Sequence, residues 1–65
     1  MKYELILTYD DGMMKKERAS LANIMGAMGI YMEDNSWVFA QIMNCTTGEI
    51  VAHWTNDPNN GITIG

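Results

Sequence analysis

Cysteine and basic side chains are scarce in this 65-residue sequence, and each scarcity excludes a class of structure or of function. One cysteine and one histidine exclude an internal disulfide and are too few for a zinc or copper site, so we expect no metal and no cofactor. The longest uninterrupted apolar run is WVFA at 37–40, far short of the ~20 residues that span a bilayer. Lys2 and Glu4 place charges where a signal peptide has an apolar core, so we expect a cytoplasmic protein, in the host cytoplasm if phage-encoded, without membrane contact.

Basic residues are confined to the start of the chain. Lys2, Lys15, Lys16 and Arg18 are the whole set, whereas residues 19–65 contain four acidic residues and no lysine or arginine. Nucleic-acid binding needs clustered positive charge, so direct contact with nucleic acid is not expected. The acidity favours a protein partner with a basic surface, although the solubility of a small acidic domain explains it equally well.

The length and the order of patterns define the expected fold. A chain of this size supports a single domain and buries only about 60% of its unfolded surface, so stability is marginal or shared with a partner. We predict one domain over 1–65, with a turn-rich tail at 56–65 that adds at most a short edge strand. The predicted class is α+β: a small antiparallel sheet with one helix packed on a face, in the order ββαββ, or alternatively βαββ with a longer helix.

The first third of the chain indicates a hairpin. Residues 3–9 (YELILTY) alternate in a strand pattern, and Asp10-Asp11-Gly12 is a strong turn signal. Met13–Ala19 is then either the return strand or the first turns of a helix with Asp11 as N-cap. The charged run Lys15–Arg18 would leave such a helix without an apolar face, which favours the strand.

Ser20 is the expected N-cap of a helix over Leu21–Met32. An apolar stripe with helical spacing would face the sheet, formed by Leu21, Ile24, Met25, Met28 and Met32. Beside it lies a stripe of small residues, Ala22, Gly26 and Gly29, which is a candidate dimer contact. Helical glycines cost ~1 kcal/mol each, and close backbone approach is one reason to tolerate that cost. Alternatively, Gly29 is the residue after a shorter helix.

The strongest pattern is a second hairpin, with Trp37–Met43 and Ile50–Trp54 flanking a turn at 45–48. A three-residue loop would pair Ala40 with Trp54 and Ile42 with Ala52. That core face would also contain Asn44, Ile50 and Val38. A four-residue loop would shift the pairing by one position.

The other face of this hairpin is also apolar, and a single helix can cover only one. It carries Trp37, Phe39, Gln41, Met43, Val51, His53 and Thr55. These residues, except Thr55, are the candidate partner-binding surface, together with the nearby carboxylates of Glu33, Asp34 and Glu49. Large amphipathic rings suit a protein interface, although in so small a domain some of the aromatics must form the core.

Catalysis is not expected. Cys45 and His53 are the only thiol and imidazole, and four strand positions separate them by roughly 13 Å. They could not share a proton, so no catalytic residue is assigned. The carboxylate pairs at 10–11 and 33–34 fall in predicted turns, which solvation and turn formation explain.

Three segments carry a resemblance: YELILTYDDG at 3–12, SLANIMGAM at 20–28 and NCTTGEIVAHW at 44–54. In their order the chain resembles small acidic accessory proteins of phages and mobile elements, the anti-CRISPR proteins among them. The resemblance covers about half the chain and implies a non-enzymatic protein that binds and inhibits a host or defence protein. The alternative hypothesis is a homodimeric structural or adaptor domain without an inhibitory role.

Overall fold

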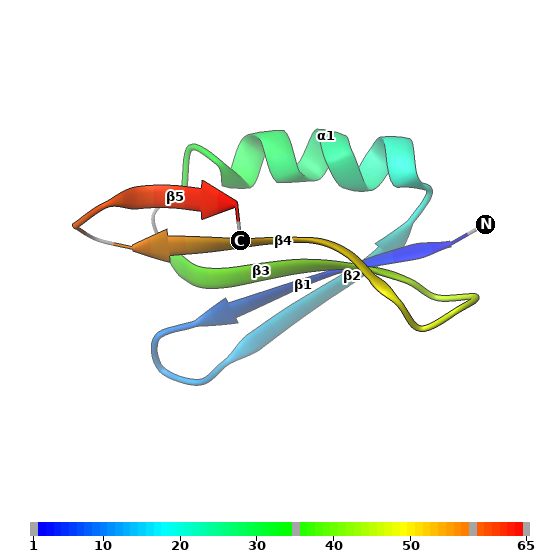
Figure 1. Cartoon of the computed structure of the whole chain (residues 1–65), viewed down its shortest axis with the longest axis horizontal. Helices are drawn as coiled ribbons and strands as arrows, with labels where there is room; N and C mark the ends of the chain where they lie inside the picture. Colours follow the sequence, from blue (N-terminus) through cyan, green and yellow to red (C-terminus); the bar gives the residue numbers. More distant parts are fainter. Residues whose placement is uncertain (1, 35, 58, 65) are drawn as a thin grey trace.

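A computed structural model describes residues 2–34, 36–57 and 59–64. Five strands and one helix follow one another as β1 (Tyr3–Tyr9), β2 (Met14–Ala19), α1 (Leu21–Tyr31), β3 (Trp37–Asn44), β4 (Ile50–Asp57) and β5 (Gly61–Ile64). The strands form one antiparallel sheet, and the helix lies on one side of it (Figure 1). The predicted α+β class is confirmed, with one strand more than the ββαββ order.

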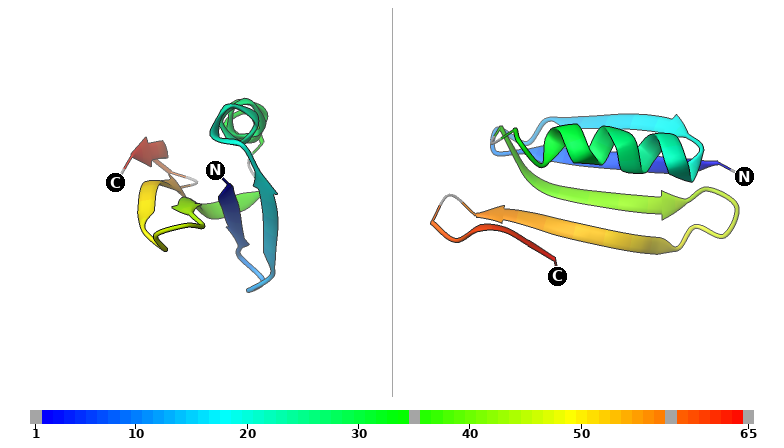
Figure 2. Two further views of the ribbon diagram at one scale, coloured as in Figure 1. Left: turned by 90° about the vertical axis from the view of Figure 1, so that its right-hand side faces the viewer. Right: turned by 90° about the horizontal axis from the view of Figure 1, so that it is seen from above.

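The strand order in the sheet is β2-β1-β3-β4-β5, and every pairing is antiparallel. The helix follows β2 and returns the chain to the free side of β1, where β3 pairs. Seen from above, α1 lies over β1 and β2, while β4 and β5 lie to one side of it (Figure 2). In the end-on view the sheet bends, so that β5 rises on the helix side of β4. The opposite face of the sheet has no helix on it.

The first hairpin forms as the charge pattern favoured. The amide of Tyr9 donates to the carbonyl of Met13 at 2.9 Å, and Gly12 adopts a φ of 88° in the turn between them. Since β2 begins at Met14, the alternative of a longer helix from Met13 is wrong. The run Lys15–Arg18 lies on an edge strand, where charges discourage pairing with other chains.

The helix begins where the sequence indicated. Ser20 accepts a hydrogen bond from the amide of Asn23 at 3.4 Å and is the N-cap, and Met32 is the C-cap. Gly29 therefore lies inside the helix, and the interpretation of it as the residue after the helix is wrong. Ile24 and Met28 are the buried helical residues, whereas Leu21, Met25 and Met32, predicted to face the sheet, are exposed.

A four-residue loop and one bulge set the register of the second hairpin. Asn44 and Glu49 close a four-residue loop, with the Asn44 amide donating to the Glu49 carbonyl at 2.8 Å. Met43 therefore pairs with Ile50 rather than with Val51. A bulge between Ile42 and Met43 then shifts the pairing by one residue. Beyond the bulge, Ile42 pairs with Ala52 and Ala40 pairs with Trp54, as a three-residue loop would predict. The predicted core pairs are confirmed, while the predicted pairing of Asn44 with Ile50 is wrong.

The second bulge overturns the predicted position of Trp37. Pairing with β1 passes from Thr8 opposite Phe39 to Tyr9 opposite Trp37, which skips Val38. A bulge of one residue reverses which side chains point to a given face. Trp37, predicted on the outer face, is therefore fully buried at 0% exposure, and Val38, predicted in the core, is only half-buried.

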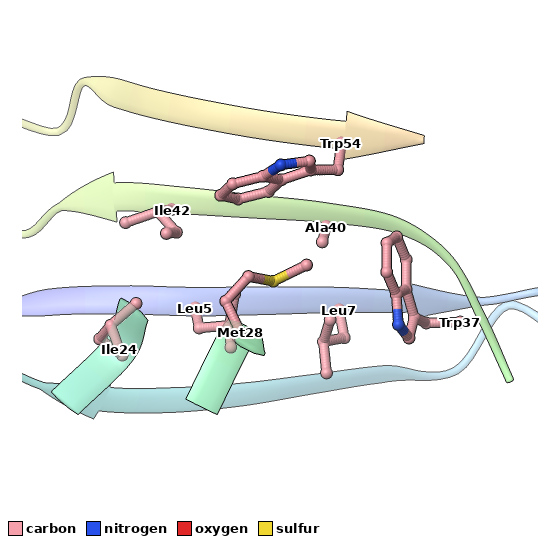
Figure 3. Packing of buried hydrophobic residues seen from close by; sticks show 8 residues of the cluster. All are labelled: Leu5, Leu7, Ile24, Met28, Trp37, Ala40, Ile42 and Trp54. Carbon is pink, nitrogen blue, oxygen red and sulfur yellow. The ribbon is translucent and has the colours of Figure 1, made fainter. Parts of the chain in front are cut away.

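The core lies between α1 and the sheet. It consists of Leu5, Leu7, Ile24, Met28, Trp37, Ala40, Ile42 and Trp54, and Figure 3 shows Met28 reaching from the helix towards the strands. The predicted tail is also part of the fold, because β4 continues to Asp57 and β5 pairs with it. Asn56, predicted as a turn residue, is buried and donates to the Trp37 carbonyl at 2.9 Å.

Candidate protein-binding surface

The sheet face opposite α1 is the candidate surface, which we call the open face. Side chains alternate along each strand, so the neighbours of the core residues point away from the helix. The open face comprises Glu4, Ile6, Thr8, Met14, Lys16, Arg18, Phe39, Gln41, Met43, His53 and Thr55. Its central residues are half-buried by their neighbours, and its outer ones are exposed. No helix of the described chain covers this face, so its apolar centre meets solvent.

Phe39 and His53 form the aromatic part of the open face. Phe39 lies opposite Thr55 and His53 lies opposite Gln41, so the two rings are diagonal neighbours on adjacent strands. Their centroids are 6.2 Å apart with an angle of 43° between the planes. This contact forms a patch of two mutually tilted rings, and aromatic rings supply much of the affinity in protein interfaces.

Of the predicted partner-binding residues, Phe39, Gln41 and His53 lie together on this face. Met43 continues the row along β3 and pairs with Glu4 on one side and Ile50 on the other. Val51 is half-exposed at the bulge beside it. Trp37 does not belong to the surface, for the reason given above.

The predicted carboxylates do not join the aromatic patch. Glu33 and Asp34 follow the helix at one end of the sheet, and Glu49 lies in the hairpin loop at the other end. The eight residues of β3 separate these ends by roughly 26 Å. Ser36 donates its amide to the Asp34 carboxylate at 2.9 Å, and this hydrogen bond lowers the pKa of Asp34 below its ordinary value. The acidic groups therefore flank the open face at its two ends.

Residues of the first hairpin were missed by the sequence-based prediction. Ile6, Thr8 and Lys16 share the open face with Phe39 because β1 pairs with β3 and β2 pairs with β1. The alternation within 3–9 indicated which residues of that strand face outward, but nothing in the sequence showed that β1 would lie beside β3. The face is consequently wider than one hairpin and less acidic than predicted.

Two basic side chains of the edge strand β2, Arg18 and Lys15, are paired with carboxylates. The Arg18 Nε donates to Glu4 Oε1 at 3.1 Å, and Glu4 is largely buried while Arg18 is exposed. This hydrogen bond is the main cause of the raised pKa of Arg18. Across the edge, Lys15 lies 3.5 Å from the Glu17 carboxylate and donates to the Tyr31 hydroxyl at 2.8 Å, which raises its pKa. These pairs reduce the positive charge available to a nucleic-acid backbone.

A cleft of about 410 Å³ lies at the end of the sheet where β3 begins and β4 ends. Its lining consists of Asp10, Ser36, Trp37, Val38, Asn56, Asp57 and Gly61. Two of the polar side chains at its wall, Asn56 and Asp57, have partners within the chain. Asn56 is bonded to Trp37, and Asp57 accepts from the amide of Asn59 at 2.8 Å and from Asn60 Nδ2 at 3.0 Å. The Asn56 amide and the Asp57 carboxylate are therefore already engaged in hydrogen bonds within the chain.

The lone thiol and imidazole lie apart. The Cys45 amide donates to the Lys2 carbonyl at 3.0 Å, whereas His53 lies opposite Gln41, four positions away along the β3 direction, or roughly 13 Å. Within the described residues, no group of three or more histidine, cysteine, aspartate or glutamate side chains is placed to hold a metal ion. Among the helices of the described chain, none has the length and apolar character required to cross a membrane.

Comparison of the chain with protein-family models, with curated proteins and with solved structures returned no match. Function is therefore argued from the surface itself.

Proposed function

We propose that this protein is a non-enzymatic binding module that uses its open face to cover a surface of another protein. The observation that carries the proposal is that α1 covers one face of a five-stranded sheet, whereas no helix of the described residues covers the other face, where the half-buried side chains of Ile6, Phe39 and Met43 form an apolar centre. A soluble antiparallel sheet usually carries polar residues on such a face, and here Phe39, Met43 and Ile6 lie among the polar residues as an apolar centre.

The distribution of charge on this side supports a protein partner. Protein interfaces have an apolar, aromatic centre surrounded by a polar rim. The Phe39–His53 pair would supply the centre, and Glu49 at one end with Glu33 and Asp34 at the other would supply the rim. Since the chain has a net charge of −4, basic groups on the partner would meet this rim favourably.

The resemblance to phage and mobile-element accessory proteins supports a specific role. In that role the partner is a host or defence protein of a bacterial cell, and covering its working surface inhibits it, as anti-CRISPR proteins do. Inhibition by coverage needs no catalytic group, which agrees with the separation of Cys45 from His53.

The test is capture of a partner from bacterial lysate by the immobilised protein and by two variants. Phe39→Glu adds a charge to the centre of the open face, and we expect it to abolish capture. Asn23→Glu adds the same charge on the helix, at the third helical position after the Ser20 cap where glutamate is favoured, and we expect it to retain capture. Near-ultraviolet circular dichroism of both variants verifies that each is folded. Equal capture by Phe39→Glu and the unaltered protein would show that the open face is not the interface.

A second comparison separates the centre from the rim. Glu33→Lys combined with Asp34→Lys reverses two rim charges without touching the aromatic centre. Rim charges act mainly on the association rate, so we expect slower binding and a weaker dependence on salt rather than a loss of the complex. An unchanged association rate would show that Glu33 and Asp34 are not part of the interface, which would then consist of the aromatic centre without these carboxylates.

A further inference from the structure

The outer surface of α1 is as distinctive as the open face, and it lies on the other side of the molecule. We name it the neutral helix surface: Leu21, Ala22, Met25, Gly26, Gly29 and Ile30, all exposed. Met25 is 50% exposed and Ile30 is 72% exposed. The solvent side of a helix normally carries charged residues, but Leu21–Tyr31 contains none. This surface has the composition of a buried helix face.

The glycines of this surface have no role within one copy of the chain. A Cβ built at Gly26 or Gly29 would meet nothing within 4 Å, and neither residue has a positive φ. The fold would therefore accept alanine at both positions, and alanine is the better helix former. Glycine in an exposed helix face is useful where a second backbone must approach closely.

We propose that the neutral helix surface is where two copies of this chain associate, with α1 of one copy packed against α1 of the other around a two-fold axis. Charge is the first argument for a second copy. Each copy carries a net charge of −4, so two copies repel, and the repulsion is weakest where they meet at a surface free of carboxylates. The helix is such a surface, and the charged edge β2 and the open face are not.

The area that a stable dimer needs is the second argument. Specific interfaces bury about 800 Å² on each partner, roughly a fifth of the 4225 Å² that this chain exposes. The helix alone is ~16 Å long and ~10 Å wide, so the contact must extend to a neighbouring element. Leu21 and Met25 of α1 are exposed, and so is Ile64 of β5, which is 85% exposed. β5 is uncharged, and Figure 2 shows it rising on the same side of the sheet as α1.

The two-fold symmetry predicts which residues lie at the centre of the contact. In a symmetric dimer the same patch is used by both copies, so antiparallel helices cross near their midpoints. The midpoint of α1 is Gly26, and Met25 precedes it on the exposed flank. Gly26 would allow the backbones to approach, and Met25 from each copy would fill the space beside the axis.

Light scattering or sedimentation equilibrium from low micromolar to several hundred micromolar tests this directly. We expect the mass to rise with concentration from 7.3 kDa towards twice that value. Met25→Glu should raise the dissociation constant by about 100-fold or more, because each substitution acts twice and places two carboxylates together. Gln41→Glu adds the same charge on the open face, on the other side of the sheet from α1, and should leave the dissociation constant within about threefold of the original. A mass that stays at 7.3 kDa over the whole range, or a dimer that survives Met25→Glu, would overturn the proposal.

The substitution Gly26→Ala distinguishes a role of Gly26 in the dimer contact from a role in the stability of one copy. We expect the melting temperature of the dilute monomer to rise, because alanine favours the helix and its Cβ meets nothing. We expect the dimer to weaken at the same time, because the new methyl group keeps the helices apart. If Gly26→Ala dimerises as well as the original, close approach of the helices is contradicted. Phe39→Glu, in contrast, should dimerise normally, which separates this surface from the proposed partner site.

Discussion

The indole of Trp37 donates from Nε1 to the backbone carbonyl of Tyr31 at 2.7 Å, and this hydrogen bond joins the last turn of α1 to the first residue of β3. Tyr31 is also bound at its other end, where its hydroxyl donates to the Glu17 carboxylate at 3.2 Å on β2. One helical residue therefore connects the central strand β3 with the edge strand β2. Trp37 itself is fully buried against the helix.

Replacing Trp37 with phenylalanine should destabilise the protein strongly. Loss of the indole donor removes one of two hydrogen bonds that the Tyr31 carbonyl accepts, the other coming from the Asp34 amide at 3.0 Å. That loss costs about 1 kcal/mol, and the smaller ring leaves a void that adds to this. Urea unfolding measures the change in the free energy of unfolding. Val38→Ala, at the adjacent half-buried bulge residue, should cost about 1 kcal/mol. If Trp37→Phe costs no more than Val38→Ala, the hydrogen bond does not join α1 to β3.

Asn56 is expected to be as important as an apolar core residue. Its side chain is 8% exposed and donates to the Trp37 carbonyl at 2.9 Å. Asn56→Ala removes that donor from a buried carbonyl and should cost about 1–3 kcal/mol of unfolding free energy. Asn60→Ala removes an exposed amide bonded to Asp57 and should change stability little. Equal effects of the two substitutions on the urea midpoint would contradict the buried bond.

Gly48 should resist substitution. Its φ of 77° lies in the left-handed region, where a side chain costs about 1–2 kcal/mol. Gly48→Ala should lower the free energy of unfolding by that amount, and Gly48→Asn by less, because asparagine tolerates this conformation. Gly26→Ala is the matched control, since Gly26 is helical, and in the dilute monomer it should stabilise by up to about 1 kcal/mol. Stabilisation by Gly48→Ala would show that the loop adopts another conformation.

Stability should fall in acid partly through Asp34 and Asp57. Hydrogen bonds from Ser36 to Asp34, and from Asn59 and Asn60 to Asp57, lower both pKa values below the ordinary 3.8. A carboxyl whose pKa is lower in the folded state stabilises that state above its unfolded pKa. This stabilisation decreases as the pH falls through about 4 and is lost below the lowered native pKa. Urea unfolding between pH 7 and pH 2 should show a shallower decrease for Asp34→Asn and Asp57→Asn. A pH dependence identical to that of the original would contradict the assignment.

Local patterns predicted most of the elements. The Asp-Gly turn, the Ser20 cap and the β-prone runs each depend on residues close in sequence, and all three appear where expected. The choice between strand and helix at 13–19 was also predictable, because a charged run suits an exposed edge strand. The pairing of Ala40 with Trp54 was predicted correctly, although the loop closes with four residues, because a bulge compensates for the extra one.

The bulge at Val38 could not be predicted from the sequence. It depends on β1, which pairs with β3 from the far end of the chain and leaves Val38 without an opposing residue. Any alternation rule applied to residues 36–44 alone places Trp37 on the wrong face. For the same reason the sequence assigned Asn56 to the turn-rich tail. Its hydrogen-bond partner is the Trp37 carbonyl, which comes near Asn56 only because Trp37 is buried.

Composition and local patterns define one small acidic α+β domain, with charge-free stretches from Ser20 to Met32 and from Ile50 to Asn56. Tertiary structure decided which of those stretches face solvent. Pairing of β1 with β3 widened the open face and turned Trp37 into the core, while the position of α1 over β1 and β2 left Met25 and Leu21 exposed. The reason is physical: periodicity specifies that an element has two faces, but only packing against distant segments decides which face is buried.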